Sequence, residues 1–159
     1  SNAESTFDKL IYHGIGLEEC TLGRSIESFI SIYGGKISGK SSVLSYERGI
    51  EANCENNRLR CVFYHYRQPG FVSFKGQTYE GINENATIAD VEKAYGVPTK
   101  VDSSIVSSYG AFPGKTETTM EYSTLGVSFT FHDQKLSTIF VYDPDNEEDA
   151  LYKQSSSLM

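Results

Sequence analysis

The sequence predicts an α+β fold of two tandem repeats, in which each repeat has one main helix and several antiparallel β-strands and the helices pack on one face of the sheet. A run with one apolar face at helical spacing occurs twice, over 25–34 and 87–96, and both runs start with a hydroxyl residue and end in Tyr-Gly. A pattern that runs from Gly to Leu through a polar turn also occurs twice, over 49–59 and 126–136. Because both patterns recur in the same order, we expect one structural unit to be used twice.

The same patterns set the boundaries of the segments. Residues 1–3, Ser-Asn-Ala, have the sequence of an expression-tag remnant and are excluded from the fold. We expect the first repeat at 10–79 and the second at 80–143. The polar C-terminal tail, 144–159, is expected to fray at its end.

Each repeat opens with an extended run that ends in Gly-Ile and leads to its helix. The helices are expected to begin after Ser25 and after Thr87, because a hydroxyl oxygen can accept hydrogen bonds from the first backbone N–H groups of a helix. Tyr-Gly then ends each helix, since Gly adopts the left-handed conformation readily, and Pro98 prevents extension of the second helix. The predicted apolar stripes are Ile26, Phe29, Ile30 and Tyr33 in the first helix, and Ile88, Val91, Ala94 and Tyr95 in the second.

The strands of each repeat are expected to follow its helix. Apolar and polar residues alternate over 127–131, which indicates a half-buried strand. Hairpin tips are expected at Asn56-Asn57 and at Asp133-Gln134, because Asn and Asp tolerate the backbone conformation of a tight turn. The returning strands are expected over 60–66 and 137–142, with a further strand over 71–79.

At these positions the sequence resembles a known family. The run Gly81-Ile82, the signature Thr87–Pro98 and the hairpin Gly126–Leu136 are similar to the β-lactamase-inhibitor-protein-like (BLIP-like) fold, and a single copy is similar to the small outer-membrane lipoproteins of the SmpA/OmlA type. The resemblance extends over about 10–142 and concerns structural positions only. It implies a protein-binding module that presents a sheet face to a partner. No inhibitor contact motif of that family is matched, so no contact residue is carried over.

Charge and the start of the chain bear on partners and location. The net charge is −7 and the pI is about 4.9, which argues against nucleic acid as a partner, since nucleic-acid binders carry basic surfaces. No stretch reaches the roughly 20 apolar residues of a transmembrane helix.

Glu4, not Met, follows the tag remnant. We expect an extracytoplasmic bacterial protein (periplasmic, secreted or a lipoprotein) with a lipid anchor on the native N-terminus as one option; excision from a longer protein is the other explanation.

The three cysteines, Cys20, Cys54 and Cys61, match no zinc-binding spacing. Cys54 and Cys61 flank a predicted hairpin turn, so a disulfide across the two strands is one interpretation. Burial of all three as small hydrophobic residues is the other.

No residue pattern indicates catalysis, a metal or a cofactor. His13, His65 and His132 are scattered, with no nucleophile in a recognisable context beside them. The acidic run 143–149 lacks the spacing and the Gly of a calcium-binding EF-hand, so a solvated surface is expected there. We therefore predict that the protein is not an enzyme, binds no metal and needs no cofactor.

Aromatic residues supply the predicted contact surface. The strand 62–66 carries aromatic side chains on both faces, and the sequence leaves open which face enters the core. An antiparallel sheet covered on one side leaves its other face open, and Tyr-rich faces are typical of protein interfaces. The predicted contact residues are Tyr64, Tyr66, Phe74, Tyr109, Phe112 and Tyr142. The alternative is that half of them are ordinary core residues.

These patterns predict a non-catalytic protein that binds another protein, either inhibitor-like or an accessory of the envelope. The alternative function is binding of a small ligand or a cell-wall fragment in the cleft between the repeats. A bound small molecule or a deep apolar pocket would favour the alternative.

Overall fold

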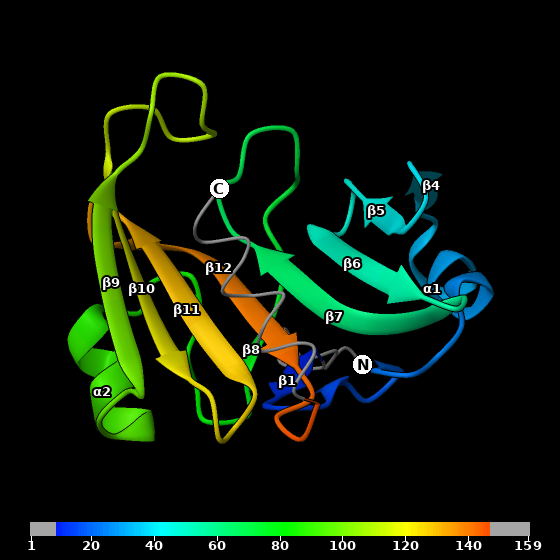
Figure 1. Ribbon diagram of the computed structural model, residues 1–159, viewed down its shortest axis with the longest axis horizontal. Helices are drawn as coiled ribbons and strands as arrows, with labels where there is room; N and C mark the ends of the chain where they lie inside the picture. The colour runs from blue at the N-terminus through cyan, green and yellow to red at the C-terminus, as the bar shows by residue number, and fades with distance from the viewer. Residues whose placement is uncertain (1–8, 147–159) are drawn as a thin grey trace, which may run out of the picture.

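The structure, a computed structural model, describes residues 9–146 and is dominated by β-sheet (Figure 1). It is 42% strand and 12% helix, and its two helices are short. The strands form one sheet of four strands and one of eight. The predicted α+β fold, a tandem repeat of helix plus antiparallel strands with the helices packed on one face, is therefore wrong. The tag remnant at 1–3 and the tail from 147 onward lie outside the described residues.

The smaller sheet consists of short strands, of which β1 and β8 fall in predicted extended runs whereas β2 and β3 were not predicted. Its order is β3-β2-β1-β8, in which β1 pairs with β8 in parallel and with β2 antiparallel. Strands of two or three residues are too short to show alternation, which explains why the fold class was mistaken. The expected strand over 71–79 contributes only β8. The bounds are Leu10–Tyr12 for β1, Gly16–Leu17 for β2, Cys20–Thr21 for β3 and Gln77–Thr78 for β8.

The larger sheet is antiparallel throughout and runs in the order β4-β5-β6-β7-β12-β11-β10-β9. Its first four strands are β4 (Lys36–Ser38), β5 (Ser42–Ser45), β6 (Ile50–Glu55) and β7 (Arg58–His65). The other four are β9 (Lys100–Ile105), β10 (Thr116–Tyr122), β11 (Val127–His132) and β12 (Lys135–Tyr142). The central pairing of β7 with β12 joins the two groups of strands. The predicted boundary between 79 and 80 falls between β8 and the second helix, and the division of the chain into 10–79 and 80–143 stays a prediction.

The two predicted helices are confirmed at the positions their caps indicated. In α1 (Ile26–Tyr33), the Ser25 hydroxyl accepts from the Ser28 N–H, and Gly34 is left-handed with φ 71°. In α2 (Ile88–Tyr95), Thr87 and Asp90 form a capping box. Figure 1 shows the helices near opposite ends of the long sheet. None of the helices within 9–146 is long and apolar enough to cross a membrane.

The predicted hairpin tips are also confirmed. Asn56 and Asn57 have φ 53° and 65°, and Asp133 and Gln134 have φ 48° and 69°. Two successive residues with positive φ form the tight turn whose twist matches that of the flanking strands. Each of these hairpins carries a register shift, one at Asn53/Cys54 and one at Thr130/Phe131.

The main core lies between the two sheets and the helices. Tyr64 of β7 and Tyr66, the residue after the strand ends, are 1% and 0% exposed, and the ring of each contacts the ring of Phe74, with centroids 5.0 and 6.0 Å apart. The Tyr64 hydroxyl accepts from the Leu17 N–H of β2 at 3.2 Å and so joins the sheets. The prediction that Tyr64, Tyr66 and Phe74 lie on an open face is therefore wrong: the smaller sheet and the segment through Phe74 pack on this side of β7.

The cysteines are buried, and no disulfide joins Cys54 to Cys61. Cys54 belongs to the main core, whereas Cys61 lies on the opposite face of the sheet beside Phe140 and Tyr142. The register shift beside Cys54 pairs it with Leu59 and pairs Cys61 with Asn53. The two sulfur atoms therefore point to different faces, which excludes a bond between them.

Candidate functional site

The face of the eight-stranded sheet opposite the core carries a row of paired residues across its centre. Phe63 of β7 lies opposite Glu51 on one side and Phe140 of β12 on the other. The rings of Phe63 and Phe140 are 4.5 Å apart, and Phe63 also stacks on His65. Strand alternation places His65 on this face because it is two residues from Phe63.

His65 fixes the loop that follows β7. Its Nε2 lies 2.9 Å from Glu51 Oε1, and its Nδ1 lies 3.0 Å from Thr138 Oγ1. Because a carboxylate only accepts, Nε2 carries the proton in this contact. The imidazole then packs against Phe71, with ring centroids 4.6 Å apart, and Phe71 packs against Tyr46 at 4.8 Å. The loop is therefore held to the sheet by these ring contacts, together with backbone hydrogen bonds from the Val72 N–H to the Tyr46 carbonyl and from the Phe74 N–H to the His65 carbonyl.

His132 fixes the loop between β9 and β10 in the same manner. Its Nε2 lies 2.8 Å from Glu117 Oε2, and its Nδ1 lies 2.7 Å from Ser137 Oγ. The ring of Phe112 stacks on the imidazole with centroids 4.0 Å apart and planes 17° apart. Each histidine thus has a carboxylate on one nitrogen, a hydroxyl on the other and a loop phenylalanine on its ring.

These contacts give His65 and His132 a positioning role. With both ring nitrogens engaged, neither imidazole presents a nitrogen to a substrate or a metal. The third histidine is His13, whose Nε2 lies 3.7 Å from Glu80 Oε2. It belongs to neither of these two arrangements. Within 9–146, no three or more His, Cys, Asp or Glu side chains gather as metal ligands would.

The two anchored loops, residues 67–73 and 106–115, form what we call the paired loops. Figure 1 shows both rising from the same end of the eight-stranded sheet. Their exposed apolar side chains are Val72, at 51%, and Tyr109, at 98%. Tyr46, 41% exposed, lies beside the first loop, because its carbonyl accepts from the Val72 N–H at 2.8 Å. Exposed apolar tips on loops held at their bases are suited to contact with another protein.

The predicted contact residues do not form one surface. Tyr109 and Phe112 lie in the second of the paired loops, Phe112 half-buried against His132. Tyr142 lies on the face opposite the core, but it is 1% exposed and its hydroxyl donates to Glu121. Tyr64, Tyr66 and Phe74 are in the core, as described above. Sequence reasoning missed Phe71 and Tyr46. The signal that could have found them is His65, which lies two residues after Phe63 and therefore on the same face of the strand.

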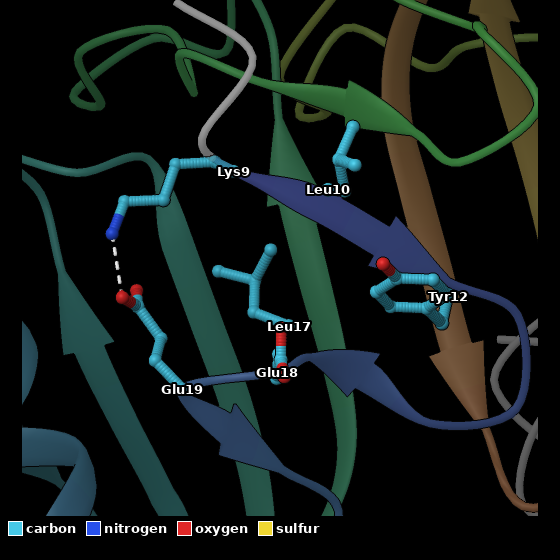
Figure 2. A pocket seen from close by; sticks show the side chains of 6 residues that line it. All are labelled: Lys9, Leu10, Tyr12, Leu17, Glu18 and Glu19. Carbon is cyan, nitrogen blue, oxygen red and sulfur yellow. Dashed lines mark hydrogen bonds and ion pairs between the residues drawn. The ribbon is translucent and has the colours of Figure 1, made fainter. Parts of the chain in front are cut away.

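Two cavities bear on the alternative of a small ligand. The first, of about 340 Å³, lies beside β1 and is crossed by an ion pair in which Lys9 Nζ is 2.6 Å from Glu19 Oε1 (Figure 2). The second, of about 280 Å³, has an apolar floor of Tyr33, Ile50 and Phe74. Both cavities are lined by residues from 9–75, so neither lies between the proposed repeats.

Comparison with known proteins gave no matching family model, no significantly similar curated protein and no significantly similar solved structure. The functional argument therefore rests on the geometry of the paired loops and of the cavities.

Proposed function

We propose that this protein is a non-catalytic binding protein that contacts another protein through the paired loops. The observation that carries the proposal is the fully exposed Tyr109 on a loop whose base is fixed by Phe112 on His132. Tyrosine supplies a large contact area with few rotatable bonds, so little conformational entropy is lost when it is buried in an interface.

Fixing the loops before binding supports the same proposal. Loop ordering costs free energy when it occurs on association, and a loop that is already ordered avoids that cost. Two separate loops are ordered here by the same arrangement of histidine, carboxylate and phenylalanine. The resemblance of the sequence to BLIP-like proteins points to the same class of function and stays a prediction. We propose an inhibitor or an envelope accessory, with a partner outside the cytoplasm.

The test is capture of the partner from the envelope and secreted fractions of the source organism. We expect Tyr109→Ser and Val72→Ser to lose a partner that the unaltered protein retains. Tyr79→Ser is the matched control, since Tyr79 is 64% exposed, stacks on Tyr12 and lies outside both loops. Capture that is unaffected by the two loop substitutions, or is lost equally in the control, would contradict the proposal.

The alternative, a small ligand, is supported by the cavity of about 280 Å³. Arg48 and Lys75 line it together with the apolar floor, which suits a short amphipathic carboxylate. The test is titration calorimetry with octanoate on the unaltered protein and on the double variant Arg48→Ala, Ile50→Ala. If this alternative holds, only the unaltered protein shows a heat of binding that saturates.

A further inference from the structure

One edge of the eight-stranded sheet is long, and no element within residues 9–146 covers it. The sheet ends in β4 and β9, and β4 has only three residues. All six residues of β9 are exposed. Val106 N–H donates to the Lys115 carbonyl, so the alternation of an antiparallel ladder directs the backbone groups of Val101, Ser103 and Ile105 away from β10. Such a row of backbone groups is a template for another strand.

The side chains along this edge show a regular arrangement. Val101 and Ile105 are 54% and 67% exposed, and strand alternation places them on the same face of β9. Lys100 and Asp102 flank Val101 and project from the opposite face of the strand, with Lys100 Nζ 3.5 Å from Asp102 Oδ2. Apolar residues therefore lie on one face of the edge and one charge of each sign on the other.

We propose that β9 pairs antiparallel with β9 of a second copy of this chain, about a two-fold axis at Val101. In that register Val101 lies opposite Val101 of the second copy. Lys100 lies opposite the second copy's Asp102, and this ion pair occurs twice by symmetry. The register therefore matches charge with opposite charge and apolar with apolar side chains.

Charge is the reason that the occupant is a second copy rather than an unrelated strand. A lysine on an edge strand ordinarily deters pairing, because it places an uncompensated charge beside the incoming chain. Within one strand Lys100 lies 3.5 Å from Asp102, so an incoming strand keeps both charges matched only if it presents an acidic residue opposite Lys100 and a basic residue opposite Asp102, as a second copy of β9 does in the antiparallel register. The other edge, β4, has Lys36 but no acidic residue and cannot compensate Lys100. A register centred on Ser103 would pair Val101 with Ile105 but would leave both charges opposite uncharged residues.

The interface is small, so the association depends on concentration. A strand pair of this length buries less surface than the roughly 1,200 Å² or more of stable protein complexes. We therefore expect a reversible dimer rather than a permanent one. Like charges at positions 100 and 102 should raise its dissociation constant by at least about tenfold.

The experiment is sedimentation velocity over a range of protein concentrations, with a charge exchange. Lys100→Asp makes both positions acidic and Asp102→Lys makes both basic, so each variant alone should remain monomeric where the unaltered protein dimerises. An equimolar mixture of the two variants should restore a dimer, because each acidic edge then meets a basic one. The double variant K100D/D102K should also dimerise.

Folding and register are controlled in the same experiment. Both positions are exposed, and thermal unfolding of each variant shows whether the monomer is intact. An unaltered protein that stays monomeric at all concentrations overturns the proposal. So does dimerisation of the single variants as strong as that of the unaltered protein, or a mixture that behaves as two monomers.

Discussion

Replacing Tyr64 by Phe removes one hydroxyl that joins the two sheets. Tyr64 is 1% exposed, and its oxygen accepts from the backbone N–H of Leu17, which is 2% exposed. The phenyl ring fits the same space, so the substitution leaves packing unchanged and deletes one acceptor. The buried Leu17 N–H would then lose the hydroxyl oxygen as an acceptor.

The magnitude follows from that lost acceptor. A buried N–H that loses its acceptor costs about 1–3 kcal/mol of the free energy of unfolding. At about 2 kcal/mol, a protein of this size should melt roughly 4–8 °C lower. The slope of unfolding free energy against urea should not change, because the surface exposed on unfolding is the same.

The assay is urea unfolding followed by circular dichroism, with Tyr109→Phe as the matched control. Tyr109 is 98% exposed, so the same chemical change there should alter the free energy of unfolding by less than about 0.5 kcal/mol. Equal midpoints for Tyr64→Phe and the unaltered protein would refute the reasoning, since they would mean that the Tyr64 hydroxyl does not bridge the sheets. Tyr64→Phe should also leave partner capture intact, in contrast to the Tyr109→Ser change proposed above.

Other substitutions and conditions test further parts of the fold. Gly126→Ala should destabilise by at least about 2 kcal/mol in urea unfolding, because Gly126 has φ 74° and an added Cβ would lie 2.1 Å from the Tyr142 carbonyl oxygen. Thr87→Ala should lower stability by about 1 kcal/mol in the same assay, since it removes the acceptor for the Asp90 N–H at the start of α2. Burial raises the pKa of Cys54 to about 11, so a thiol reagent at pH 8 should label it slowly until urea is added. Burial also raises the pKa above its ordinary value in Tyr33, Tyr64, Tyr66, Tyr95 and Tyr122. These side chains keep their protons longer in the folded state, so stability should be complete below pH about 10 and fall as the pH rises further, as measured by circular dichroism.

Features that depend on near neighbours could be predicted from the sequence. The start of α1 at Ser25 and its end at Gly34 are set by hydrogen bonds within a few residues. The tips at 56–57 and 133–134 are set by the backbone that Asn and Asp tolerate. The sequence also placed Tyr109 and Phe112 in a loop, because Pro113-Gly114 interrupts the strand pattern there.

The fold class could not be predicted, because it depends on pairings between distant segments. β1 pairs with β8 in parallel, and β7 pairs with β12, yet neither pairing is encoded in a local pattern. β9 has no buried residue, so it shows no alternation at all. Because short or fully exposed strands such as β2, β3 and β9 left no pattern in the sequence, the two helical patterns led to a fold class with too much helix.

The sequence by itself determined that the run 62–66 carries aromatic side chains on both of its faces, with Tyr64 and Tyr66 on one and Phe63 and His65 on the other. Only the tertiary structure decided which pair is the core. The smaller sheet, through Leu17, and the segment through Phe74 pack against Tyr64. On the opposite face, His65 contacts Glu51 and Thr138 through its ring nitrogens and the loop residue Phe71 through its ring. Period-two alternation states which side chains share a face, but a face becomes interior only when another layer covers it, and that layer comes from segments far away in the chain.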